Sequence, residues 1–192
     1  MLTKQEIENQ IIKKESLASS DLKHKNFSSV TFESCDFSKS DFTGSRFLEC
    51  KWIGCNLSLA KFDSCRLQGA EFENSKLMGV NFAKSDKMFL AMKFKKCLIA
   101  TANFSGLDLK NTMFLECVIR ETFFNETNLT NADFAGSDLT GSCFHNTNLS
   151  HANFVGAINY SINPLTNKMT KSKFSIPEAL ALLNHLDITI EH

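Results

Sequence analysis

The sequence predicts a solenoid, a rod whose core repeats along its length, and three observations lead to this fold class. The first is composition: the 192 residues include 18 Phe but 1 Tyr and 1 Trp, so nearly all the aromatic side chains lack a polar atom and suit positions sealed from water. The second is an apolar residue at every fifth position over most of the chain. The third is a small residue two positions before most of these, so that large and small side chains fill one interior together.

The five-residue frame consists of two runs separated by a slip of two residues. The first run holds 14 consecutive Phe, Leu or Trp residues, at Leu17, Leu22, Phe27, Phe32, Phe37, Phe42, Phe47, Trp52, Leu57, Phe62, Leu67, Phe72, Leu77 and Phe82. The second run holds 14 more, at Phe89, Phe94, Ile99, Phe104, Leu109, Phe114, Ile119, Phe124, Leu129, Phe134, Leu139, Phe144, Leu149 and Phe154. Of the 18 Phe, 16 lie in the frame, and Phe123 and Phe174 lie outside it. Because a period of five matches neither a helix nor a strand, the chain must bend within each repeat to point every fifth side chain at a common axis.

The small position holds mostly Ser, Thr, Ala and Cys. Six of the seven cysteines occupy it, and Cys143 is the exception; the six are Cys35, Cys50, Cys55, Cys65, Cys97 and Cys117. A metal ladder or a disulfide between cysteines 20 residues apart is one interpretation, but no zinc-like spacing accompanies them. Packing of small thiols is the interpretation we favour, and we expect no metal and no cofactor.

The repeats near the C-terminus carry a family resemblance. Residues 132–136 (ADFAG), 137–141 (SDLTG) and 152–156 (ANFVG) resemble the A(D/N)LXX signature of pentapeptide repeat proteins, and the resemblance extends over residues 15–158. It implies an all-β fold, a right-handed quadrilateral β-helix with four pentapeptides per coil and residues 20 apart stacked on each other. Residues 17–158 would then form about seven coils, with the register slip at residues 83–88.

The two ends are predicted to differ from the repeats. Residues 1–16 are assigned as an N-terminal cap, and Ile7 and Ile11 within residues 3–17 are consistent with a short capping helix. Residues 159–192 are assigned as a linker, a short α-helix and a tail. Ser175 and Glu178 form a capping box at the helix start, and residues 187–190 alternate like a short strand.

The C-terminal helix allows two interpretations. Its apolar stripe either caps the rod or also pairs two rods into a homodimer, as in dimeric members of the resembled family. The residues predicted to form the dimer contact are Ile176, Leu180, Leu183, Leu186, Ile188 and Ile190.

The register slip also allows two interpretations, a bulge with no role or a small loop that contacts a partner. The candidate loop residues are Lys84, Ser85, Asp86, Lys87 and Met88. The position of the slip near the middle of the chain resembles that of the functional loops of the Qnr branch of the family, which are longer than this one.

Charge and motif content favour a binding protein over an enzyme. Lys+Arg and Asp+Glu both number 21, which argues against a strongly basic nucleic-acid binder. No catalytic motif is present, and a filled rod offers no concave pocket. The sequence has no apolar run of membrane-spanning length and no signal-peptide pattern, and its cysteine count is odd, so we expect a cytoplasmic protein with reduced thiols.

The resemblance to the Qnr-like, topoisomerase-protecting branch implies a partner. Members of that branch resemble a DNA duplex in size and charge and engage type II topoisomerases. The hypothesis is therefore a non-enzymatic DNA mimic that binds DNA gyrase or topoisomerase IV and protects it from inhibitors such as quinolones, and the alternative is a generic interaction scaffold with a different protein partner. The candidate acidic surface comprises Glu116, Glu121, Glu126, Asp133 and Asp138.

A second surface signal is apolar. Four residues of coil-forming repeats are predicted to point outward, namely Met113, Leu115, Val118 and Phe123, and Leu98 is predicted to stack against Val118. This cluster predicts either a contact surface or a surface covered by a terminal segment.

Overall fold

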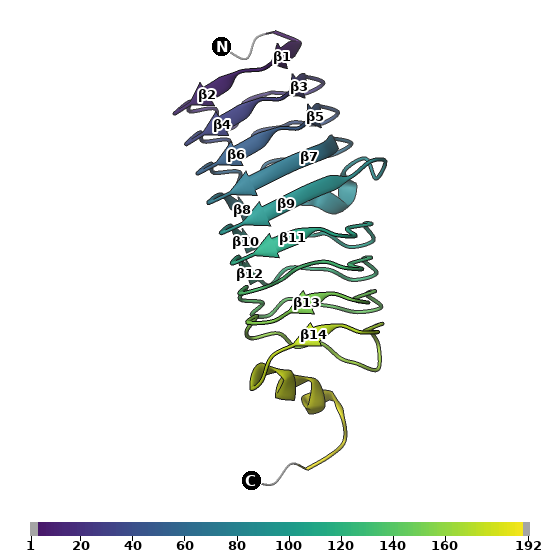
Figure 1. Cartoon of the computed structure of the whole chain (residues 1–192). Helices are drawn as coiled ribbons and strands as arrows, with labels where there is room; N and C mark the ends of the chain where they lie inside the picture. Colours follow the sequence, from purple (N-terminus) through teal and green to yellow (C-terminus); the bar gives the residue numbers. More distant parts are fainter. Residues whose placement is uncertain (1–3, 190–192) are drawn as a thin grey trace.

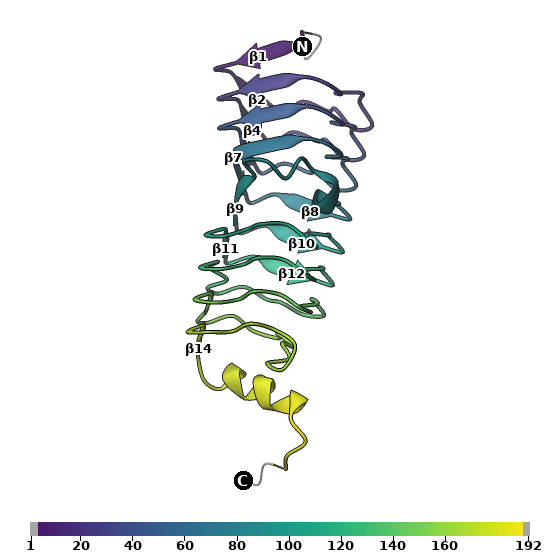
Figure 2. The same cartoon turned by 90° about the vertical axis from the view of Figure 1, so that its right-hand side faces the viewer.

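The computed structural model describes residues 4–189 and confirms the predicted fold class, a β-solenoid of about eight coils (Figures 1 and 2). The described N-terminal residues lie at one end of the rod, and a short helix follows the last coil at the other end. All strand pairs are parallel, as expected when each coil lies in register on the next.

The strands are short because the chain turns a corner after almost every one. The strands are β1 (Glu6–Glu8), β2 (Ile11–Lys13), β3 (Asn26–Ser28), β4 (Thr31–Glu33), β5 (Arg46–Leu48), β6 (Lys51–Ile53), β7 (Arg66–Glu73), β8 (Lys76–Met78), β9 (Ala91–Lys95), β10 (Leu98–Ala100), β11 (Met113–Leu115), β12 (Val118–Arg120), β13 (Asn153–Phe154) and β14 (Lys173–Phe174). Two 3₁₀ helices complete the elements of residues 4–189, η1 (Phe82–Lys84) and η2 (Glu178–His185).

We number the four faces of the rod in the order in which the chain crosses them. Face 1 contains β1, β3 and β5, and face 2 contains β2, β4, β6, β9, β11, β13 and β14, while β7 spans both. Face 3 contains β8, β10 and β12, which lie one below another in Figure 2. Face 4 is held by isolated bridges such as Asp21 to Asp41.

Aromatic rings form continuous ladders inside the rod. On face 2 the rings of Phe32, Trp52, Phe72, Phe94, Phe114, Phe134, Phe154 and Phe174 stack with centroids 4.7–5.4 Å apart. Fifteen of the 18 Phe are buried, and each buried ring contributes about 1.5–3 kcal/mol of transfer free energy. Phe174, which lies outside the predicted frame, is the last rung, because it falls 20 residues after Phe154.

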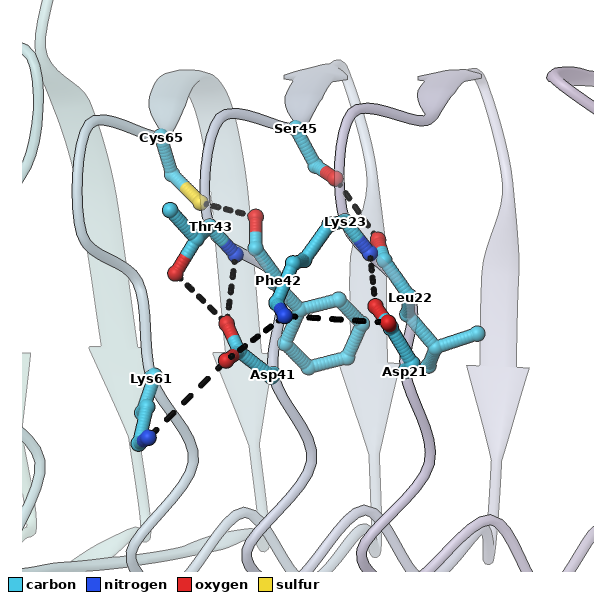
Figure 3. A network of polar contacts seen from close by, with 9 residues as sticks. All are labelled: Asp21, Leu22, Lys23, Asp41, Phe42, Thr43, Ser45, Lys61 and Cys65. Atoms are coloured by element: carbon cyan, nitrogen blue, oxygen red, sulfur yellow. Dashed lines mark hydrogen bonds and ion pairs between the residues drawn. The ribbon is translucent and has the colours of Figure 1, made fainter.

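The small position has a second role that packing alone did not predict. Its hydroxyl or thiol donates a hydrogen bond to the backbone carbonyl of the core residue one coil earlier. Figure 3 shows this for Ser45 Oγ and Leu22 O, 2.8 Å apart, and for Cys65 Sγ and Phe42 O, also 2.8 Å apart. Burial raises the pKa of Cys65 to about 12 and that of Cys50 to about 11, so both thiols stay protonated.

The corner position, two residues after each core residue, has left-handed backbone geometry. All eight glycines lie there, with φ between +64° and +72°, and non-glycine residues fill most of the other corners. At Gly44 an added Cβ would approach His24 Nδ1 to 2.5 Å. Glycine at this corner therefore makes room for the corner side chain of the coil above.

The N-terminal helix prediction is wrong for the described residues. Residues 4–17 contain β1 and β2 instead, and Ile7 and Ile12 are buried as two further rungs that pair with Phe27 and Phe32. Ile11 is exposed. The five-residue frame thus begins earlier than Leu17, and stacking on the next coil outweighs the local helical pattern.

The C-terminal segment differs from its prediction in helix type and in its cap. Residues 178–185 form the 3₁₀ helix η2, and Ser175 Oγ does not cap it but accepts a hydrogen bond from the Gly156 N–H at 3.0 Å. The side chain is thus used to attach the segment to the last coil. No strand forms over residues 187–189, and Ile190 lies outside the described residues.

The register slip is built differently from its prediction. Gln68 pairs with Ala91 and Ala70 pairs with Met92, so Gly69 has no partner in β9. Phe89 is not a core rung: it is 70% exposed, whereas Leu90 packs against the core and Met92 is buried. The coil gains three residues before Ala91, since Gln68 and Ala91 are 23 apart, and it lacks a counterpart of the corner residue Gly69. Together these changes give the net shift of two residues.

Candidate protein-binding surfaces

The predicted loop, residues 84–88, is held to the rod by most of its side chains. Ser85 is buried and its Oγ donates to Phe62 O at 3.2 Å. Asp86 accepts from Arg66 Nε at 2.9 Å, Lys84 lies 3.5 Å from Asp63 Oδ2, and Lys87 Nζ donates to Gly106 O at 3.1 Å.

Two apolar side chains at the end of this loop point into solvent. Met88, which was among the predicted residues, and Phe89, which was not, are both exposed. The sequence signal that assigned Phe89 to the core was its place in a resumed five-residue count, which cannot distinguish a rung from a loop residue.

The predicted acidic surface divides into two structural groups, and the aspartates form the first. Asp133 accepts hydrogen bonds from the Ala135 N–H at 3.0 Å and from Asn153 Nδ2 at 2.9 Å. Asp138 accepts from Thr140 and Asn159 and pairs with Arg120 at 3.0 Å. These carboxylates close their own turns.

Burial raises the pKa of Asp138, but the hydrogen bonds from Thr140 and Asn159 and the Arg120 guanidinium outweigh burial and bring the pKa to about 2. The same turn recurs at Asp41. An Asp or Asn directly before a core residue, with Ser or Thr two positions on, was the sequence signal for this structural role.

The glutamates form the second group and occupy three successive corners of one coil, as their spacing predicted. Glu116, Glu121 and Glu126 all have positive φ, between +50° and +58°, and are exposed. Glu116 pairs with Lys96 at 3.5 Å. Within residues 4–189, Glu121 and Glu126 form no ion pair.

Charges in the N-terminal half are largely paired between coils. On face 4, Lys23 Nζ lies between Asp21 and Asp41, at 3.6 and 3.7 Å, and Lys61 lies 3.8 Å from Asp41 (Figure 3). On face 2, Glu71 pairs with both Lys51 and Lys93. Stacking of opposite charges reduces the field around these paired groups, while residues 4–96 as a whole hold 16 Lys or Arg against 12 Asp or Glu.

The outward apolar residues do not form one cluster. Met113 and Leu115 lie on face 2, Val118 on face 3 and Phe123 on face 4, because consecutive repeats occupy different faces. The predicted stacking of Leu98 against Val118 is confirmed, since the two are paired in register in β10 and β12.

A cleft lies between η2 and face 4, where the filled-rod prediction placed none. It has a volume of about 520 Å³ and is lined by Cys143, His145, Asn163, Thr166 and His185, among others. Ser161 Oγ and His185 Nε2 are 3.3 Å apart across it. No group of three or more His, Cys, Asp or Glu residues in 4–189 is arranged to hold a metal ion.

The predicted dimerisation residues differ in exposure. Ile176, Leu180 and Ile188 are exposed, Ile176 at 84%. Leu183 and Leu186 are half-buried, and the neighbouring Ala181 and Leu182 pack against the core. The helix therefore covers the end of the ladder with one side and presents apolar side chains on the other.

Comparisons with known proteins place the chain by fold and by family. A trypsin-treated variant of QnrB1, a plasmid-mediated fluoroquinolone resistance protein, is similar over 97% of this chain and 100% of its own, with 17% identity and a TM-score of 0.66. HetL, a pentapeptide repeat protein involved in heterocyst differentiation regulation from the cyanobacterium Nostoc sp. strain PCC 7120, is similar over 87% of this chain and 81% of its own, with 20% identity and a TM-score of 0.37. No curated protein sequence matches significantly.

Sequence models of the repeat match two parts of the chain. A pentapeptide repeat region model matches residues 25–88, and a model of eight pentapeptide repeats matches residues 102–146 and 120–156. Among residues 4–189, no helix has the length and apolarity needed to cross a membrane. With more than half of its length matched and the β-solenoid confirmed, the chain belongs to the pentapeptide repeat family.

Proposed function

We propose that this rod is a non-enzymatic binding protein that engages a type II topoisomerase, DNA gyrase or topoisomerase IV, and protects it from inhibitors such as quinolones. The observation that carries the proposal is the pair of exposed corner glutamates, Glu121 and Glu126. They lie on one coil and have no cationic partner within residues 4–189. A cationic DNA-binding channel attracts such unpaired carboxylates over long range.

The dimensions of the rod support this class of partner. About eight coils at about 4.8 Å each give a length of roughly 40 Å, similar to one helical turn of a DNA duplex. The interior is filled with stacked rings, so recognition falls to the outer faces and corners. QnrB1, whose fold matches along both chains, is a fluoroquinolone resistance protein.

Two further contacts belong to the same proposal. The loop end at Met88 and Phe89 supplies an exposed apolar contact half-way along the rod. Leu180 on the exposed side of η2, together with Ile176 just before the helix, pairs two rods end to end into a homodimer. We also propose a cytoplasmic location, in keeping with the free cysteines.

A specific observation favours the alternative, a scaffold for a different protein partner. Glu116 and Asp138 are paired with Lys96 and Arg120, so the candidate acidic surface does not present a continuous row of carboxylates like the phosphates of a duplex. A partner that recognises single corners and apolar side chains would fit this arrangement as well.

The experiment is a gyrase supercoiling assay with ciprofloxacin, with and without the protein. Rescue of supercoiling by the wild-type chain, and its loss in the double variant Glu121→Lys/Glu126→Lys, is expected. Glu49→Lys is the matched control, because Glu49 is also a corner residue with positive φ and lies three coils away. No rescue at any concentration of folded wild-type protein would refute the proposal and leave the scaffold.

The dimer is tested separately by measuring mass in solution. Leu180→Lys is expected to abolish an end-to-end dimer, while Leu165→Lys, at an exposed site outside η2, is expected to leave it intact. A mass unchanged by Leu180→Lys contradicts the contact through η2.

A further inference from the structure

Face 3 carries an apolar strip at mid-height. Leu98 and Val118 are neighbours in β10 and β12, and their side chains point outward and are half-buried. Met78 at the end of β8 is 42% exposed, and it lies beside Ala100 in the adjoining column. The strip is flat because β8, β10 and β12 pair without a bulge.

The charges around the strip have a regular order. Along the column the residues run Lys76, Leu98, Val118 and Asp138, each paired with the next. Lys76 forms no ion pair within residues 4–189. It lies one coil before Leu98, just as Asp138 lies one coil after Val118.

The neighbouring corner repeats this order. Lys96 lies one coil before Glu116 at the same corner, next to Leu98, as Glu116 lies next to Val118, and the two charges are 3.5 Å apart. In these two columns, basic groups therefore lie on one side of the midpoint between β10 and β12, and acidic groups lie at equal distances on the other side. Arg120, at the end of β12, is the exception to this order, and it is paired with Asp138 of its own chain at 3.0 Å.

We propose that face 3 binds a second copy of this chain in antiparallel orientation. The two-fold axis lies in the plane of contact, parallel to the strands and midway between β10 and β12. This operation places Leu98 on the partner's Val118 and Lys96 on the partner's Glu116. Lys76 then lies beside the partner's Asp138, which Arg120 of the same chain already pairs, so the charge argument rests on Lys96 and Glu116. An isologous contact forms each pair twice, so the Lys96–Glu116 pairs of the two copies become one cluster of four alternating charges.

Glycine corners let the faces approach. On the corner between faces 3 and 4, Gly79 and Gly141 lie at equal distances on either side of the midpoint, so each meets the other across the axis. Between them, Thr101 meets the partner's Glu121. A parallel arrangement would instead oppose Glu116 and the partner's Glu121, which are both acidic and unfavourable together. The antiparallel orientation is therefore the one that the charges select.

The contact is small. Four stacked coils at about 4.8 Å cover roughly 19 Å of the rod, and one narrow face of this length buries less area than a stable dimer of standard size. Self-association is expected to be weak, with a dissociation constant on the order of tens of micromolar. This contact is distinct from the end-to-end contact through η2 and does not depend on a topoisomerase partner.

The test exchanges charges between two variants. Lys96→Glu and Glu116→Lys each place like charges across the axis, so each variant alone is expected to self-associate at least tenfold more weakly than wild type in sedimentation equilibrium. A 1:1 mixture is expected to regain association, because only the mixed dimer pairs opposite charges. All chains carry Leu180→Lys, so that association through η2 is not counted.

Two controls complete the experiment. Lys39→Glu changes a corner lysine outside the strip and is expected to leave association unchanged. Leu98→Lys is expected to abolish association, with circular dichroism confirming that the rod remains folded. The proposal is overturned if the 1:1 mixture of Lys96→Glu and Glu116→Lys associates as weakly as either variant alone. It is also overturned if the Leu180→Lys chain with an unchanged face 3 stays monomeric at millimolar concentration.

Discussion

Replacing Tyr160 by Phe should stabilise the rod. Tyr160 is buried in the last coil, where its ring lies 5.9 Å from that of Phe154 and 5.6 Å from that of Phe174, and its hydroxyl has no hydrogen-bond partner. A buried polar group without a partner costs about 1–3 kcal/mol, and the substitution removes it while leaving the ring and its contacts in place. We expect the free energy of unfolding to rise by about 1–2 kcal/mol near pH 7.

The same residue predicts a pH dependence. Burial, and then the nearby Glu178 carboxylate, raise the pKa of Tyr160 above its usual value. A raised pKa means that the fold favours the neutral phenol, so its contribution is complete below about pH 10 and is lost as the pH rises through the folded-state value. The advantage of Tyr160→Phe over wild type should therefore grow in alkali.

The assay is urea unfolding followed by far-ultraviolet circular dichroism at pH 7 and at pH 10.5. Equal denaturant slopes for the two proteins would show that the free energies can be compared. A variant less stable than wild type by more than about 1 kcal/mol at pH 7 would refute the reasoning, because it would mean that the hydroxyl is satisfied in the folded protein.

Three other substitutions or conditions test the core, the turns and the slip. Trp52→Phe should change the free energy of unfolding by less than about 1 kcal/mol, because the loss of ring volume is offset by removal of a buried Nε1 without a partner. Phe72→Ala, on the next rung, should cost about 3–5 kcal/mol in the same unfolding assay. Asp138, with a pKa of about 2, should contribute about 2 kcal/mol that is present above about pH 4 and lost as the pH falls toward 2; acid titrations in which Asp138→Asn loses stability in parallel with wild type would contradict this. Phe89→Ser should lower the free energy of unfolding by less than about 0.5 kcal/mol, against about 3–5 kcal/mol for Phe94→Ala. A cost for Phe89→Ser as large as that for Phe94→Ala would show that Phe89 packs in the core.

The five-residue frame predicted most of the core because each rung is one apolar side chain at a fixed spacing. It failed where a residue at the expected spacing does not point into the core, and where a core residue lies outside the counted repeats. Phe89 kept the count but lies in a loop, while Ile7 and Ile12 belong to the core but lie in a segment with a helical pattern. The decisive force there is stacking on the adjacent coil, which a local pattern does not contain.

The candidate surfaces were predicted less completely. The ring formed by the corner glutamates followed from their five-residue spacing, and so did the pairing of Leu98 with Val118. The structural use of Asp138 was missed because its role depends on Thr140 and on Asn159 from the next coil. Surface charge on a solenoid is set by such vertical neighbours, so counting charges along the chain overstates how many are free.

The insertion of residues after Asp86, at the register slip, has a consequence for how such rods change over evolution. The ring of Phe94 stacks on that of Phe72 at 5.1 Å, as closely as in coils of ordinary length, although 22 residues separate the two. An insertion at this place is therefore absorbed within one coil and leaves the ladder on both sides in phase. Segments of other lengths at this site are therefore expected to leave the core unchanged, which makes it a place to graft recognition sequences.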